Sequence, residues 1–77
     1  MRVSIIKKIG PYDGPHEKNI ITYKMRTEEG HEIAWHENGK RGLVARVGQT
    51  FTGLVMRGKQ PDYKKSKLVD TQLKIEI

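Results

Sequence analysis

Two neighbouring segments alternate apolar and polar residues with a period of two, and this pattern constrains the fold more than any other feature of the chain. Residues 20–27 place Ile21, Tyr23 and Met25 on one face and polar or charged residues on the other, and residues 31–36 alternate in the same way. A period of two is that of side chains along a strand. Two glutamates and a glycine lie between the segments and are typical of a turn. The sequence therefore predicts a β-hairpin.

Three other segments predict further strands. The first covers about residues 2–9, where Val3, Ile5 and Ile9 share one face. A fourth strand covers about residues 50–59, with a bulge or bend at Gly53. The last strand alternates from about residue 68 to residue 77.

Together these segments predict one all-β domain over residues 1–77. Residues 43–47 fit one helical turn or a short extended stretch equally well, and they are too short to cover the face of a sheet. The fold class we predict is a small five-stranded OB-like barrel, with at most one short helical turn between the third and fourth strands. Closure of the barrel removes exposed strand edges, which otherwise promote aggregation.

Several classes of function are disfavoured by the composition. The chain has no cysteine, so it has neither a disulfide framework nor a thiolate metal site. His31 and His36 are five residues apart and would lie on opposite faces of a strand, so we expect no metal. No serine nucleophile is accompanied by a plausible base, and we expect neither an enzyme nor a cofactor. Without a signal sequence or transmembrane run, we expect a cytoplasmic protein with no membrane partner.

The positive charge is concentrated in one part of the chain. The protein has 15 basic and 9 acidic residues, for a net charge of +6, and residues 1–39 contain six of each sign. Residues 40–67 contain eight basic residues and a single acidic residue, Asp62. Such an excess favours a polyanionic partner, because each phosphate that is neutralised releases condensed counterions. A lysine-rich solvated surface is the ordinary alternative.

Residues 23–36 consist of an alternating strand, an acidic-glycine turn and a strand that ends near an aromatic residue. This run resembles the second and third strands of OB-fold nucleic-acid-binding domains. Residues 47–52, together with Tyr63 in a lysine-rich loop and Thr71 in the last strand, are similar to the second half of OB domains in bacteriophage replication-associated proteins. The resemblance covers about residues 20–77. It implies a ligand groove over the second and third strands, between the first and last loops.

Aromatic and basic residues are the candidate ligand contacts, because nucleic-acid bases stack on aromatic rings while lysine and arginine follow the phosphates. Tyr63 lies in a polar loop and is predicted to make contacts. Trp35 fits the core and the groove equally, since it shares a face with Ile33 but lies near the end of its strand. His36 is a polar neighbour of the groove. The candidate cations are Lys24, Arg26, Arg57, Lys59, Lys64, Lys65 and Lys67.

The function that we predict is binding of single-stranded nucleic acid with low sequence specificity through a basic groove and aromatic stacking, with DNA as the first candidate partner and RNA as the second. The alternative is a small protein-interaction module, for example a phage protein that inhibits a host factor through its basic face. A replication protein or a host protein is then the partner. A detached domain of a larger helicase or polymerase would fit the same fold. The sequence leaves the oligomeric state open.

Overall fold

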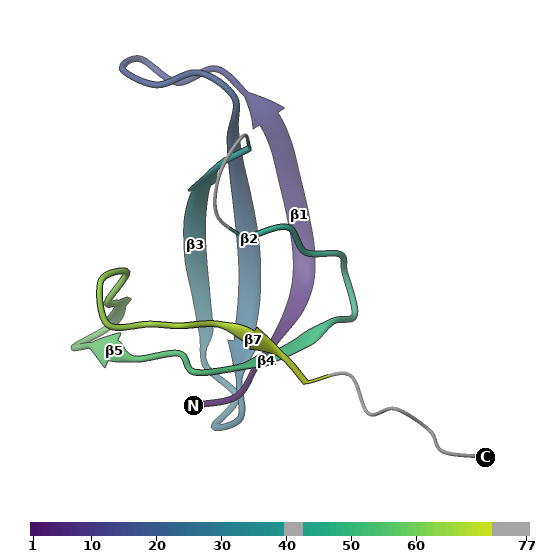
Figure 1. Cartoon of the computed structure of the whole chain (residues 1–77), viewed down its shortest axis with the longest axis vertical. Coiled ribbons are helices and arrows are strands. Elements are labelled where there is room, and N and C mark those ends of the chain that lie inside the picture. The colour runs from purple at the N-terminus through teal and green to yellow at the C-terminus, as the bar shows by residue number, and fades with distance from the viewer. Residues whose placement is uncertain (40–42, 72–77) are drawn as a thin grey trace.

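A computed structural model describes residues 1–39 and 43–71, and in this part of the chain all regular structure is β (Figure 1). Five strands form an antiparallel sheet in the order β3-β2-β1-β4-β7, and β5 and β6 form a separate two-stranded sheet. The strands are β1 (Val3–Tyr12), β2 (Ile20–Thr27), β3 (Glu32–Asn38), β4 (Thr50–Thr52), β5 (Met56–Arg57), β6 (Gln60–Pro61) and β7 (Val69–Asp70).

The predicted hairpin is confirmed as β2 and β3. Tyr23 pairs with Trp35 and Met25 with Ile33, so the apolar residues of the two strands share one face of the sheet. The turn closes through the Gly30 N–H, which donates to the Thr27 carbonyl oxygen at 2.9 Å. Alternation correctly predicted the face of each residue here because the pairing between β2 and β3 has no irregularity.

In β1 the prediction was wrong beyond residue 5, because the strand contains a bulge. Ile5 pairs with Met25, but the next paired residue is Lys7, which faces Lys24, and Ile9 then faces Thr22. A bulge inserts one residue and reverses the faces that follow. Ile9 is therefore exposed instead of sharing the buried face of Ile5. The strand also extends to Tyr12, beyond its predicted end at about residue 9.

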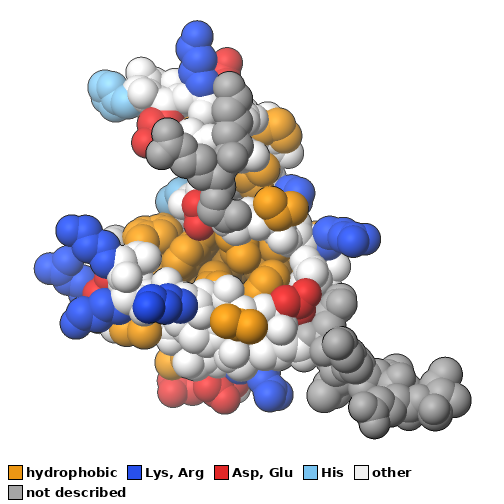
Figure 2. All heavy atoms as spheres, viewed as in Figure 1, with side chains coloured by type: hydrophobic (Ala, Val, Ile, Leu, Met, Phe, Trp, Pro, Cys, Tyr) orange, Lys and Arg blue, Asp and Glu red, His pale blue; other side chains and the backbone are white. Residues whose placement is uncertain are grey.

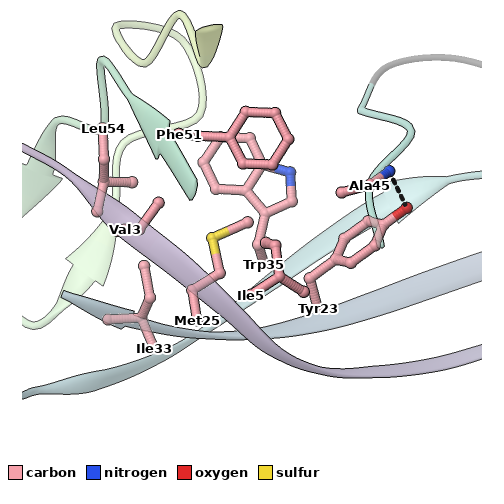
Figure 3. Close-up of a cluster of buried hydrophobic side chains, with 9 residues drawn as sticks. All are labelled: Val3, Ile5, Tyr23, Met25, Ile33, Trp35, Ala45, Phe51 and Leu54. Carbon is pink, nitrogen blue, oxygen red and sulfur yellow. Dashed lines mark hydrogen bonds between the residues drawn. The ribbon is translucent and has the colours of Figure 1, made fainter. Parts of the chain in front are cut away.

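The core lies on the concave face of the sheet, where β1, β2 and β3 meet the chain around β4 (Figures 1 and 3). Trp35, left open by its position in the sequence, is only 4% exposed and belongs to this core. Tyr23 is fully buried. Its hydroxyl donates to the Leu43 carbonyl oxygen at 3.1 Å and accepts the Ala45 N–H at 3.3 Å. The buried residues are Val3, Ile5, Tyr23, Met25, Ile33, Trp35, Ala45, Phe51 and Leu54.

The predicted fourth strand is divided at Gly53. This glycine has a φ of 94°, and a Cβ atom there would overlap the Lys67 carbonyl oxygen. The Lys67 N–H donates to the Gly53 carbonyl oxygen at 3.1 Å. The chain therefore bends away from β4 where it passes against the segment leading to β7, and it continues into the small β5–β6 hairpin (Figure 1).

The all-β class is confirmed, and the ladder of the described residues is open, with β3 and β7 at its two ends. Residues 43–47 contain no helical turn. The last predicted strand is observed at Val69–Asp70. Residues 72–77, which the prediction also assigns to this strand, lie outside the described residues, as do residues 40–42, which include two of the basic residues in the 40–67 count.

Candidate nucleic-acid interface

Tyr63 is held on a short turn that Asp62 organises. One carboxylate oxygen of Asp62 accepts the backbone N–H groups of Lys64 and Lys65 at 3.1 and 3.2 Å, and its carbonyl oxygen accepts the Ser66 N–H at 3.0 Å. An aspartate side chain that accepts nearby backbone N–H groups stabilises a turn. The only acidic residue of the 40–67 segment thus shapes the loop that carries two of its lysines.

The ring of Tyr63 packs against Trp35 at the edge of the sheet. The two ring centroids are 4.5 Å apart, with an angle of 53° between the ring planes. This separation is that of a favourable aromatic pair. The Tyr63 hydroxyl makes long contacts to the backbone of β3, at 3.5 Å to the Ala34 carbonyl oxygen and 3.4 Å to the His36 N–H. Tyr63 remains 46% exposed, so one part of the ring covers Trp35 while another part faces solvent.

Two grooves meet at the Tyr63 side chain. The first is basic and is lined by Arg57, Gln60, Pro61, Asp62, Tyr63, Lys64 and Lys65. The second contains no lysine or arginine among its lining residues, which are Trp35, Glu37, Leu43, Val44, Tyr63, Ser66 and Leu68. Figure 2 shows Lys and Arg side chains gathered on the side where β5 lies, next to a hollow that exposes hydrophobic side chains. Tyr63 therefore lines both grooves, and only the first is flanked by several lysine and arginine side chains.

Only some of the predicted loop cations lie together. Arg57, Lys64 and Lys65 line the basic groove with Tyr63. Lys59 instead lines a different cleft, which also contains Glu29 and Glu32. Lys67 is exposed, and its backbone is bonded to Gly53.

Lys24 and Arg26 lie on the convex face of the sheet, opposite to the core face. Lys24 is exposed and pairs with Ala34 of β3. A nitrogen of the Arg26 guanidinium lies 3.8 Å from a carboxylate oxygen of Glu32, and both side chains are more than half exposed. These two cations are therefore separated from the basic groove by the β3 edge, where the Tyr63 hydroxyl lies.

His36 belongs to a hydrogen-bonded chain that the sequence pattern did not predict. Its Nδ1 lies 2.9 Å from the Thr22 hydroxyl, which in turn lies 2.7 Å from the Tyr12 hydroxyl. The chain links β1, β2 and β3 across the convex face. Period-two alternation assigns Thr22 and His36 to the same face, but the Tyr12 contact depends on two irregularities in β1 that leave no pattern in the sequence.

No protein family, curated protein or solved structure matches this chain. The described residues contain no group of three or more His, Cys, Asp or Glu residues that could hold a metal ion. In residues 1–39 and 43–71 there is also no helix long and apolar enough to cross a membrane.

Proposed function

We propose that this protein binds single-stranded nucleic acid with little sequence specificity, with DNA as the first candidate ligand and RNA as the second. The observation that carries the proposal is the half-exposed Tyr63 ring, which packs on Trp35 and lines a groove together with Arg57, Lys64 and Lys65. A single strand has phosphates on one side and flat, weakly polar bases on the other. The basic groove suits the phosphates and the exposed part of the Tyr63 ring suits a base, and no base-specific contact is required.

Tyr63 is the residue on which a base would stack. Stacking of one base on an aromatic side chain contributes about 1–3 kcal/mol to binding. Trp35 lies behind the Tyr63 ring at 4.5 Å, so it would support that ring and not offer the first surface to a ligand. Arg57, Lys64 and Lys65 would contact phosphates beside the stacked base, and the exposed Lys67 would extend the contact along the nucleic acid.

An OB-like fold is part of the proposal. The OB-fold is a five-stranded, partly open barrel that binds ligands on its second and third strands and on adjoining loops. Two features support this assignment: the five-stranded antiparallel sheet, and the β5–β6 hairpin and Tyr63 loop that lie against the free edge of β3.

Substitution of Tyr63 tests the stacking role. We expect Tyr63→Ala to weaken binding of a fluorescently labelled unstructured DNA oligomer by about 5- to 150-fold, which corresponds to the loss of one stacked base. Tyr63→Phe keeps the ring and should bind within about twofold of the wild type, since a base stacks on the ring and not on the hydroxyl. Equal affinities for the wild type and Tyr63→Ala would show that Tyr63 does not stack on a base.

A protein partner is the second candidate, in which Arg57, Lys64 and Lys65 of the basic groove would face an acidic surface of that partner. Capture of one defined protein by the tagged chain from nuclease-treated lysate, without binding to single-stranded DNA or RNA in titrations, would favour this candidate over the first.

A further inference from the structure

The bulge in β1 determines which lysine lies on which face of the sheet. Lys7 has the same parity as Val3 and Ile5, whose side chains are buried in the core. In an unbroken strand Lys7 would therefore point toward the core face. Because the pairing shifts between Ile5 and Lys7, Lys7 instead faces Lys24 on the convex face. Bulges often redirect a side chain next to a functional site.

Lys8 lies on the opposite face. It pairs with Tyr23, and its Nζ lies 5.8 Å from the centroid of the buried Tyr23 ring. A cation at this distance from a ring face is attracted to it. Two adjacent lysines thus point to opposite sides of the same sheet, and only Lys8 has an aromatic partner in the described structure that accounts for its position.

The Lys7–Lys24 pair is unfavourable for the sheet itself. Like charges directly opposite each other on neighbouring strands destabilise the pairing. Among the described residues, no carboxylate lies within 4.0 Å of the ammonium group of either lysine. Arg26, the next residue of β2 on the same face as Lys24, is in contrast paired with Glu32. A bound anion between the two ammonium groups would remove this repulsion.

The pair also lies on a direct path to Tyr63. Lys7 faces Lys24, Lys24 faces Ala34, and the Ala34 carbonyl oxygen contacts the Tyr63 hydroxyl. The small side chain of Ala34 leaves the row unobstructed between the lysines and the β3 edge. On the concave side, β4, β7 and the chain near them cross in front of the sheet (Figure 1). The convex face is therefore the open route away from the Tyr63 loop.

We propose that the nucleic-acid backbone continues from the Tyr63 loop over the convex face, across β3 and β2, and that Lys7 of β1 contacts a phosphate together with Lys24. This inference rests on the proposed function, which already places the ligand on the second and third strands, and adds to it Lys7 as a contact residue whose face is set by the bulge. The row crosses the strands, so the nucleic acid runs transverse to β1, β2 and β3.

The adjacent lysines provide a matched test. Lys7→Gln and Lys8→Gln remove the same charge from neighbouring positions of one strand, and thermal unfolding followed by circular dichroism establishes that each variant is folded. Affinity for a labelled single-stranded DNA oligomer is measured by fluorescence anisotropy from 50 mM to 500 mM salt. We expect Lys7→Gln to bind about eightfold more weakly at 50 mM salt and to reduce the salt slope by about 0.7, the value for one phosphate contact on a single strand. Lys8→Gln should bind within about twofold of the wild type.

The other outcomes are distinguishable. If Lys8→Gln loses affinity and Lys7→Gln does not, the strand passes over the concave face and the inference is wrong. Equal behaviour of the two variants, with or without a loss, also overturns it, because the charge then acts without regard to face. In both cases the proposed function survives, provided that the wild type binds. Absence of binding by the wild type at 50 mM salt would overturn the proposed function itself.

Discussion

Removal of the Tyr23 hydroxyl tests how the chain after β3 is attached to the sheet. Tyr23 is fully buried, and its hydroxyl bonds both the Leu43 carbonyl oxygen and the Ala45 N–H. Tyr23→Phe keeps the ring but leaves these two backbone groups without that partner. An unsatisfied buried group costs about 1–3 kcal/mol. Because Ala45 is buried, we expect the full cost for its N–H group. Leu43 is only partly buried, so water can replace part of the hydrogen bond to its carbonyl oxygen.

We therefore expect Tyr23→Phe to lower the free energy of unfolding by about 2 kcal/mol. In a domain of this size that corresponds to a fall in Tm of about 8–16 °C. Thermal and urea unfolding followed by far-UV circular dichroism measure both quantities. Tyr63→Phe is the matched control, since its hydroxyl makes only long contacts at an exposed edge and should change stability by less than about 0.5 kcal/mol. A similarly small effect for Tyr23→Phe would refute the claim that its hydroxyl anchors residues 43–45.

Three further substitutions test other parts of the structure. Gly53→Ala should lower the free energy of unfolding by more than about 2 kcal/mol in urea titrations, because it adds a steric overlap with the Lys67 carbonyl oxygen to the strain of a positive φ. Gly30 also has a positive φ but lies in open space, so Gly30→Ala should lower the free energy of unfolding by only about 1 kcal/mol. Equal losses for the two variants would contradict the close approach at Gly53. Thr22→Val should cost about 1–2 kcal/mol because it removes the hydroxyl between Tyr12 and His36, and Thr22→Ser should retain most of the stability in the same assay. Arg26→Ala should change Tm by no more than a few degrees, because the ion pair with Glu32 is exposed. The same variant should weaken DNA binding severalfold in anisotropy titrations. A large loss of stability would show instead that Arg26 has a structural role.

Most of the central hairpin was predictable because local pattern and tertiary structure agree there. Ile33, Tyr23 and Met25 alternate without interruption, and each of them is buried. The faces of Lys7 and Lys8 were not predictable, because a bulge is set by the pairing with β2 and leaves no mark in the periodicity of β1. Gly53 was recognised as a bend or bulge, but its close contact with Lys67 joins residues 14 positions apart and is visible only in the fold.

The candidate site was predictable in composition but not in arrangement. Counting charge along the chain and noting an aromatic residue in a basic loop identified Tyr63, Lys64 and Lys65. Trp35, which packs against Tyr63, lies 28 positions earlier in the chain. Alternation along β3 could not decide whether its side chain belongs to the core or to the groove, because its ring is covered by the loop that carries Tyr63. Proximity of Lys59 to Tyr63 in sequence suggested proximity in space, but the β5–β6 hairpin turns Lys59 toward a different cleft.

The salt dependence of binding by the unmodified protein tests the central claim most directly. The measurement is the affinity for an unstructured single-stranded DNA oligomer at 50 mM and at 200 mM salt. If about five phosphates are neutralised, the logarithm of the affinity falls with a slope of about −3.5 against the logarithm of salt concentration, and the affinity drops about 100-fold between the two conditions. No detectable binding at 50 mM salt, or an affinity that changes less than about threefold, would contradict binding through a cationic groove.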